Sequence, residues 1–463
     1  MYDAEHPVLD EATLRALEAQ YCSYGDTVHY LPEPKFFDGC EGSFMYDAQG
    51  RQFLDLQMWY SAVNFGYRNP RLNAVAHRQL DTLPQVASQY LHREKVELAA
   101  MIAQDAEKKW GRKGRVHFNV GGAQAVEDSL KLVRNASGGK QLMFAFEGGY
   151  HGRTLGASAI TSSYRYRRRF GHFSDRAQFI EFPYHFRGPK GMSKEEYGHY
   201  CVQKFARLFE TEYNGVLDTK TGQAEYAAFY IEPIQGTGGY VIPPPNFFIE
   251  LKKILDQHGI LLVVDEIQMG MWRTGKLWSI EHFGVQPDVL VFGKALTNGL
   301  NPLSGVWARE ELINPEVFPP GSTHSTFNSN PMGTAVALET LRMTHEVDYG
   351  AQVLEKGAYF LEGLKALQKR WPQIGDVDGL GLALRAEICE ADGFTPNKAL
   401  LNRMEAEGMK GDIEIDGKRY GLILDVGGYY KNVITLAPSL EISKDEIDLA
   451  LKLLDAVLRR CVD

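Results

Sequence analysis

The chain has 463 residues, of which 44% are hydrophobic, and a formal net charge of −9 at pH 7. This length allows one large domain or two to three smaller ones, and the negative charge argues against a general affinity for nucleic acid or anionic membranes. No run reaches the roughly 18 apolar residues of a membrane span, and the first residues lack a signal-peptide pattern. The scattered cysteines and histidines lack metal-site spacing. We therefore expect a cytoplasmic protein with reduced thiols and no resident metal.

The N-terminal part, from Leu9 to about Asp55, predicts a helix and a hairpin-like stretch whose turn is Asp47 to Gly50. We expect residues 1–57 to pack on a small C-terminal domain, residues 58–330 to form a large domain, and residues 331–463 to form the small α+β domain. No internal repeat or long linker suggests tethered modules.

In the expected large domain, short apolar runs alternate with helical patterns from about Val116 to Trp307. This alternation is typical of an α/β fold with a mostly parallel sheet covered by helices. The predicted strands are residues 116–120, 141–146, 227–231, 260–264, 289–292 and 305–307, and the predicted helices are 125–135, 194–212 and 247–258, with Gly259 as a C-terminal cap. Beyond residue 331, two long helices, short strands and a terminal helix after Ser443 are expected.

Two of these strands end in reactive side chains. The apolar run from Ile260 to Val264 stops at Asp265, and the run ending at Gly293 is followed by Lys294. Ligand sites form at the carboxyl edge of open α/β sheets, where neighbouring strands are about 4.8 Å apart, so the acid and the amine are expected to converge. Pyridoxal phosphate (PLP) requires such a pair, because the amine forms a Schiff base and the carboxylate keeps the pyridine nitrogen protonated.

Further motifs extend over nearly the whole chain. They are the stretch from Val263 to Gly275, Tyr-His-Gly at 150–152, Glu-Pro-Ile-Gln-Gly at 232–236, and Ser-Thr-Phe at 325–327 before Asn330-Pro331. With these motifs the chain resembles the class III PLP-dependent aminotransferases, which have fold type I. The resemblance implies transfer of an amino group from an amine or amino acid to a keto acid through a Schiff base on Lys294. It also implies a homodimer with shared active sites.

The resemblance assigns the cofactor contacts residue by residue. Backbone amides at the start of a helix would bind the phosphate, since the family's hydroxyl side chains are absent from the stretch at 121–124. An aromatic residue and an isoleucine would sandwich the ring, and a glutamine would donate to its hydroxylate. The implied set is Gly122, Ala123, Tyr150, His151, Asp265, Ile267, Gln268, Lys294 and, from the neighbouring subunit, Thr326. We expect burial and nearby positive charge to lower the pKa of Lys294, which lets it move protons.

At the positions expected to bind the substrate, the sequence departs from the family pattern. Thr435 stands where many members carry an arginine that binds the substrate carboxylate, and Thr237 replaces a gating glutamate. We therefore expect bulky apolar amines, or amino acids reacting away from their α-carboxylate, to be better donors than glutamate. Arg385 is the candidate replacement cation, with a paired structural arginine as an equal alternative. Trp59 and Tyr60 are candidates for an apolar substrate wall.

Two other functions remain open. Amino-acid racemases, epimerases and an aminomutase resemble the same family and share these residues, but a racemase exchanges the Cα proton without needing a keto acid. A PLP-sensing regulator built on this fold would need a DNA-binding module, and no basic helix-turn-helix segment precedes the fold. The basic cluster at 165–169 receives no role.

Overall fold

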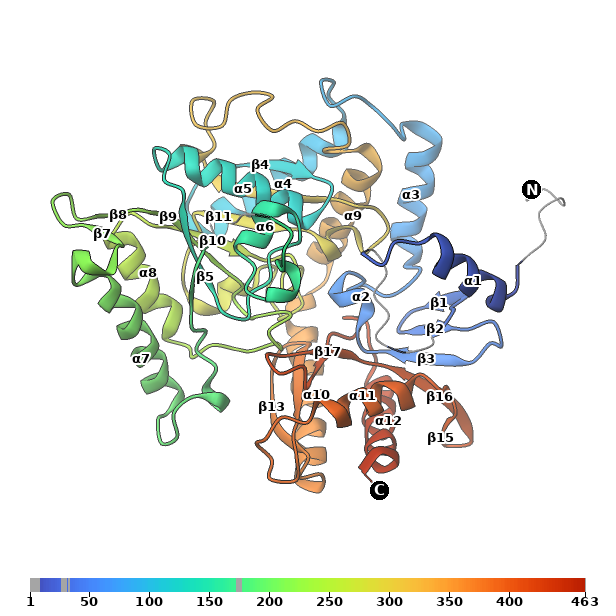
Figure 1. Cartoon of the computed structure of the whole chain (residues 1–463). Helices are drawn as coiled ribbons and strands as arrows, with labels where there is room; N and C mark the ends of the chain where they lie inside the picture. Colours follow the sequence, from blue (N-terminus) through green and yellow to red (C-terminus); the bar gives the residue numbers. More distant parts are fainter. Residues whose placement is uncertain (1–8, 26–30, 32–33, 172–176, 463) are drawn as a thin grey trace.

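The computed structural model describes residues 9–25, 31, 34–171 and 177–462 (Figure 1). The first eight residues, where the sequence predicts no signal peptide, lie outside this described part. Over the described ranges, no helix combines the length and the apolar character needed to cross a membrane. Cys22, Cys40, Cys201, Cys389 and Cys461 are all free.

A seven-stranded sheet with the order β4-β12-β11-β10-β9-β5-β6 forms the centre of the larger half of the molecule (Figure 1). The five strands from β11 to β6 run parallel, and β12 is antiparallel to both neighbours. The strands are β4 (Gly114–Asn119), β5 (Leu142–Phe146), β6 (Gln178–Ile180), β9 (Tyr226–Ile231), β10 (Leu261–Asp265), β11 (Val289–Phe292) and β12 (Ser304–Arg309). The predicted mostly parallel sheet is confirmed, and the edge strand β6 was missed.

Helices cover both faces of this sheet. Alternate residues of one strand enter two different apolar clusters: Val264 faces one and Val263 faces the other. Both faces of the strands are therefore buried, which explains their continuous apolar sequence. The helices of this half are α3 (Pro70–Thr82), α4 (Arg93–Trp110), α5 (Gly122–Ala136), α6 (Leu155–Ala159), α7 (Lys194–Ala206), α8 (Phe247–Gln257) and α9 (Pro331–Glu346), and a small hairpin of β7 (Leu217–Asp218) and β8 (Gln223–Ala224) is added.

The helix predictions hold with one correction. The predicted helix 194–212 ends earlier, because α7 stops at Ala206 and a short 3₁₀ turn follows. Helix α8 ends at Gln257 with His258 as its C-cap, and Gly259 follows in the left-handed conformation with φ +65°, as predicted for a C-terminal cap.

The C-terminal part contains a four-stranded antiparallel sheet in the order β13-β14-β18-β17, shown in orange to red in Figure 1. Its strands are β13 (Ile374–Leu380), β14 (Ala383–Ile388), β17 (Asp425–Gly427) and β18 (Val433–Leu436). The other elements are α10 (Tyr349–Arg370), α11 (Lys398–Gly408), β15 (Ile413–Ile415), β16 (Lys418–Ile423) and α12 (Lys444–Val462).

The N-terminal segment joins the C-terminal part through a sheet. After α1 (Glu11–Tyr21), strands β1 (Gly39–Glu41), β2 (Phe44–Tyr46) and β3 (Gln52–Asp55) form a sheet of order β1-β2-β3-β16-β15. The predicted turn connects β2 to β3, and the amide of Gly50 donates to the carbonyl of Asp47 at 2.8 Å. Strands β3 and β16 are parallel, with Leu54 opposite Leu422. The domain boundaries at residues 57 and 330 stay a prediction.

Directly after β3, the chain makes an unusual turn, α2 (Met58–Ser61). All four residues have positive φ angles, between 43° and 63°. Side chains disfavour this left-handed conformation by roughly 1–2 kcal/mol per residue. The carboxylate of Asp55 fixes the start of the turn by accepting hydrogen bonds from the amides of Gln57 and Met58 at 2.7 and 2.9 Å.

Candidate active site

A cavity of about 210 Å³ lies where β10 and β11 end. It is lined by Gly122, Ala123, Tyr150, His151, Gly152, Glu232, Ile234, Asp265, Ile267, Gln268, Met269 and Lys294. Every predicted cofactor residue except Thr326 is in this set. Residues from five separate chain segments therefore meet in one enclosed space, as expected at the carboxyl edge of a parallel sheet.

Lys294, two residues after the end of β11, lines this cavity. Its φ of +44° is left-handed, so the backbone turns sharply at the strand end. Burial lowers the pKa of Lys294, whereas the charges of Asp265, Glu232 and Asp425 act in the opposite direction. The expected contribution of nearby positive charge was therefore wrong: burial alone lowers the pKa, because charged amines are costly to desolvate.

Asp265, at the end of β10, is paired with His151. The Nδ1 atom of His151 lies 2.8 Å from Oδ2 of Asp265, and Oδ1 accepts a hydrogen bond from the amide of Ile267 at 3.0 Å. Burial alone would lower the pKa of His151, but the hydrogen bond and charge of Asp265 raise it overall. The imidazole therefore holds the carboxylate in a fixed orientation.

Glu232 is a cavity residue that the sequence analysis did not single out. Its carboxylate accepts hydrogen bonds from the amides of Tyr150 and Gly236, both at 2.9 Å, and burial raises its pKa to about 7. It directly follows β9, the parallel neighbour of β10. The strand-end argument that identified Asp265 applies equally to Glu232 and was the available signal.

The end of the cavity formed by α5 suits a phosphate. Gly121, the N-cap, supplies no side chain to bind the first amides of this 15-residue helix. Those amides and the helix dipole are available to an anion. Two glycines at this end of the cavity leave no room for a side chain. A Cβ on Gly122 would come within 2.8 Å of Ile267, and one on Gly152 within 2.6 Å of Ala123.

Together these features fit PLP. A buried amine, a carboxylate held by His151, an uncapped helix terminus and flat apolar contacts are the groups that this cofactor needs. Gln268 donates one amide hydrogen to the hydroxyl of Tyr240 at 3.2 Å, and its amide nitrogen carries a second hydrogen for the ring hydroxyl. Among the described residues, no cluster of three or more His, Cys, Asp or Glu side chains could hold a metal ion.

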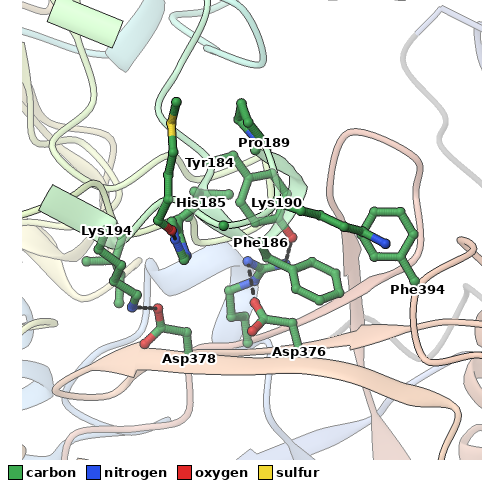
Figure 2. Close-up of a pocket in the computed structure, with 15 residues that line it drawn as sticks. Tyr184, His185, Phe186, Pro189, Lys190, Lys194, Asp376, Asp378 and Phe394 are labelled. Carbon is green, nitrogen blue, oxygen red and sulfur yellow. Dashed lines mark hydrogen bonds and ion pairs between the residues drawn. The ribbon is translucent and has the colours of Figure 1, made fainter. Parts of the chain in front are cut away.

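Arg385 is not brought into this cavity. Its guanidinium lies 3.1 Å from Asp376 and 2.6 Å from Glu387, and it also donates to the hydroxyl of Tyr184. It lines a different pocket of about 410 Å³, where Figure 2 shows Tyr184 and Asp376 together with the ion pair of Lys194 and Asp378. The arrangement favours the structural alternative for Arg385, because its charge is already compensated.

The other predicted substrate residues lie at the protein surface. Trp59 and Tyr60, in the left-handed turn α2, are 56% and 38% exposed. Thr435 in β18 donates to Oδ2 of Asp425 in β17. Thr326 lines a separate cavity of about 790 Å³ with apolar neighbours that include Val86, Phe327 and Met332.

Comparisons with known proteins agree with a PLP site in this cavity. The fold and the site define a PLP-dependent enzyme, and the chain belongs to the family described as aminotransferase class-III, whose model matches residues 28–458. It is 33% identical to an alanine/serine racemase of Pyrococcus horikoshii over 90% of this chain and 84% of the relative. It is 31% identical to ornithine aminotransferase 2 of Staphylococcus aureus, over 92% of this chain and 94% of the relative.

Solved structures match almost end to end. An (S)-enantioselective omega-transaminase from Thermomicrobium roseum has a TM-score of 0.85 and 28% identity, covering 99% of this chain and 100% of its own. A PLP-bound amine transaminase from an uncultivated Pseudomonas species has a TM-score of 0.83 and 25% identity, covering 94% and 97% of the two chains. The predicted fold type I, PLP as cofactor and aminotransferase function are thereby confirmed.

Proposed function

We propose that Lys294 binds PLP covalently and transfers the proton that moves during exchange of an amino group between an amine donor and a keto acid. The observation that carries this proposal is the meeting of Lys294 and Asp265 in one cavity at the uncapped start of α5. When bound, PLP supplies an electron sink next to the substrate Cα. The lowered pKa of Lys294 supports its role, because a neutral Nζ can accept the Cα proton.

The surrounding residues have distinct parts in this proposal. Asp265 holds a proton on the ring nitrogen, and His151 holds Asp265 in position through its hydrogen bond. Tyr150 and Ile267 sandwich the ring, and the amides of Gly122 and Ala123 bind the phosphate. Gln268 donates to the ring hydroxyl. These are the roles that the family resemblance implies, and the presence of all seven residues in the cavity wall supports them.

We propose a transaminase rather than a racemase, although a racemase is among the relatives. The test is a half-reaction: the holoenzyme is mixed with an amine donor alone, and then with pyruvate. A transaminase loses the cofactor absorbance band with the donor and regains it with pyruvate. Inversion of a single alanine enantiomer with full retention of the band and no keto product would instead favour the racemase.

The expected donor preference follows from the absence of the family's carboxylate-binding arginine, at whose position Thr435 stands. A bidentate pair between arginine and a buried carboxylate is a strong contact, and losing one costs about 2 to 5 kcal/mol. Thr435 and the already paired Arg385 supply no such contact. We infer that bulky apolar amines, or amino acids reacting away from their α-carboxylate, are better donors than glutamate, with Trp59 and Tyr60 as an apolar wall. Glutamate as the best donor in a panel would contradict this.

We also propose a cytoplasmic homodimer with shared active sites. The apolar cavity beside Thr326 and the 69% exposed Phe327 support a self-association surface there. In this arrangement Thr326 reaches the phosphate bound by the partner subunit. The test is dilution of the holoenzyme with simultaneous measurement of mass, bound PLP and activity, which are expected to fall together.

A further inference from the structure

Arg273, in the loop that follows β10, is a fully buried arginine whose partners are all neutral. Within the described part of the chain it donates four hydrogen bonds. They go from Nε to the hydroxyl of Ser61, from Nη2 to the side-chain oxygen of Asn64, and from Nη1 to the carbonyls of Leu382 and Pro438. Burial lowers the pKa of Arg273 only to about 10, so the guanidinium is charged at neutral pH. Buried charges are costly to desolvate and are usually paired with an opposite charge, so this arrangement is unusual.

The partners of Arg273 belong to two different parts of the molecule. Ser61 is the last residue of the left-handed turn α2, and its hydroxyl donates to the side-chain oxygen of Asn64 at 3.0 Å. Leu382 joins β13 to β14, and Pro438 follows β18. The amide of Leu382 also donates to the carbonyl of Arg273 at 3.0 Å. The guanidinium therefore bridges the end of the turn and the C-terminal sheet.

The turn also packs against residues 294–299, which we call the Lys294 segment. Asn298 in this segment binds the main chain of residues 65–66: it accepts from the amide of the first and donates to the carbonyl of the second, both at 2.9 Å. A Cβ on Gly299 would come within 3.0 Å of the Trp59 ring, so the ring lies directly against this glycine. Trp59 is nevertheless 56% exposed. The path of the turn thus sets where Trp59 lies relative to the Lys294 segment.

This path needs support from outside the turn. Its four residues all have positive φ angles, which side chains disfavour. Strained backbone persists only where surrounding contacts fix it, and such segments are common at functional sites. Asp55 fixes the start of the turn, and the hydrogen bond from Arg273 to Ser61 fixes its end. A buried arginine with neutral acceptors is therefore explained by the turn that it holds.

We propose that Arg273 is a positioning residue for the amino donor: it holds turn α2 against the C-terminal sheet and so keeps Trp59 in place beside the Lys294 segment. This inference rests on the proposed transaminase function and on the proposed apolar wall, and it names the residue that holds this wall. Arg273 itself does not line the cofactor cavity, so its effect on the reaction is indirect.

The first test compares two donors that differ in the group that would contact this wall. With pyruvate as acceptor, kcat/KM of the holoenzyme is measured for 1-phenylethylamine and for isopropylamine, which has a methyl group in place of the phenyl. Arg273→Lys keeps the charge but cannot form the same fork of hydrogen bonds. We expect kcat/KM to fall at least about tenfold more for 1-phenylethylamine than for isopropylamine, because small displacements of positioning groups cost large factors in rate. Equal losses for the two donors would overturn the proposal.

A double-mutant cycle connects this effect to Trp59. Trp59→Ala removes that part of the wall, so adding Arg273→Lys to it is expected to leave the ratio of kcat/KM for the two donors unchanged within about twofold. A further change as large as in the native background would show that Arg273 does not act through Trp59, and would refute the role. Arg385→Lys is the matched control, because it makes the same change in a similarly buried arginine that is paired with Asp376 and Glu387. Its donor ratio is expected to stay native.

Ser61→Ala is the milder variant that decides the question if Arg273→Lys does not fold. It leaves the guanidinium in place and removes only the acceptor of its Nε. We expect the same donor-dependent loss at a smaller size, about threefold or more in the ratio of kcat/KM. In that case a native donor ratio in folded, PLP-loaded Ser61→Ala would contradict the proposal.

Hydrogen exchange measures the hold on the turn without any turnover. In the PLP-loaded enzyme without donor, Arg273→Lys is expected to speed amide exchange in residues 61–65 and at Leu382 by at least about tenfold, with native exchange in β9, β10 and β11. Native exchange in residues 61–65 would overturn the proposal. Failure of the transaminase function gives a different result, because then no donor removes the cofactor absorbance band, and the exchange rates alone decide whether Arg273 holds the turn.

Discussion

Lys294 combines a left-handed backbone, a half-buried position in the cavity wall and electrostatic interactions with three carboxylates. Lys294→Ala removes both the covalent anchor and the proton carrier, so we expect turnover to fall by at least about 10³. Activity and the absorbance of bound PLP before and after borohydride reduction are the measurements. Lys444→Ala, which removes only an exposed lysine paired with Glu355, is the control. Near-normal turnover with a reducible imine in Lys294→Ala would refute the assignment.

Asp265 illustrates how a neighbour prepares a functional carboxylate. His151 and the amide of Ile267 each use one of its oxygens. Asp265→Asn keeps the shape but loses the negative charge that holds the ring nitrogen protonated, so we expect PLP to remain bound while the rate falls sharply. Bound PLP is measured by absorbance and the rate in the half-reaction. An unchanged rate would rule out this role.

Glu232 makes stability depend on pH. Its folded-state pKa of about 7 lies above the ordinary value, so the folded protein binds the proton more tightly than the unfolded chain. Stability from this group is therefore full below about pH 4.3 and declines as pH rises towards 7, by about 2 to 4 kcal/mol in all. Urea unfolding of the holoenzyme at several pH values is the measurement. Glu232→Gln is expected to flatten this decline, and an identical pH profile would contradict it.

At the scale of elements, β13 and β14 hold a buried ion cluster. Arg385→Ala leaves Asp376 and Glu387 without that cation, and breaking a buried pair in this way costs about 3 to 5 kcal/mol. We expect a large loss in the free energy of unfolding, with little change in the preference between carboxylate-bearing and other donors. Lys194→Ala, which breaks the more exposed pair with Asp378, is expected to cost at most about 1 kcal/mol.

A selective loss of carboxylate-bearing donors in Arg385→Ala, with native stability, would instead restore Arg385 as a substrate residue. Thermal unfolding and kcat/KM for two donors, one with and one without a carboxylate, distinguish these outcomes.

Elements buried on both faces were the most predictable from sequence. Strands β9, β10 and β11 have continuous apolar runs, and the acid and amine at two of their ends were placed correctly. Strand β6 was missed because three residues at a sheet edge give little pattern. The contact of Asp425 with Thr435 was not accessible from sequence, since it depends on the register of β17 and β18. The pairing of β13 with β14 likewise places Asp376 beside Arg385, and the hydroxyl of Tyr184 comes from a distant loop.

At the scale of the whole molecule, the apolar cavity beside Thr326 is the surface proposed for the partner subunit. Phe327→Asp places a charge on this 69% exposed side chain, and burying it in an interface would be costly. We expect a monomer that retains less PLP and activity, measured by analytical ultracentrifugation and absorbance. Tyr213→Asp, at a 92% exposed aromatic outside that cavity, is the control and is expected to stay native. A fully loaded, active Phe327→Asp dimer would contradict the proposed surface.

The parallel pairing of β3 with β16 has a consequence for synthesis on the ribosome. Leu54 in β3 is synthesised long before its pairing partner Leu422 in β16. At translation rates of about 5–20 residues per second, the delay between their synthesis is roughly 20 to 70 s. During that interval one edge of β3 has no partner, which exposes a template for wrong pairing in the nascent chain. Because the turn that carries Trp59 and Tyr60, the proposed apolar wall for the substrate, follows β3 directly, this turn is held in place only when translation is almost complete. Premature termination before β16 would therefore yield a chain that contains Lys294 but lacks the strand that pairs with β3.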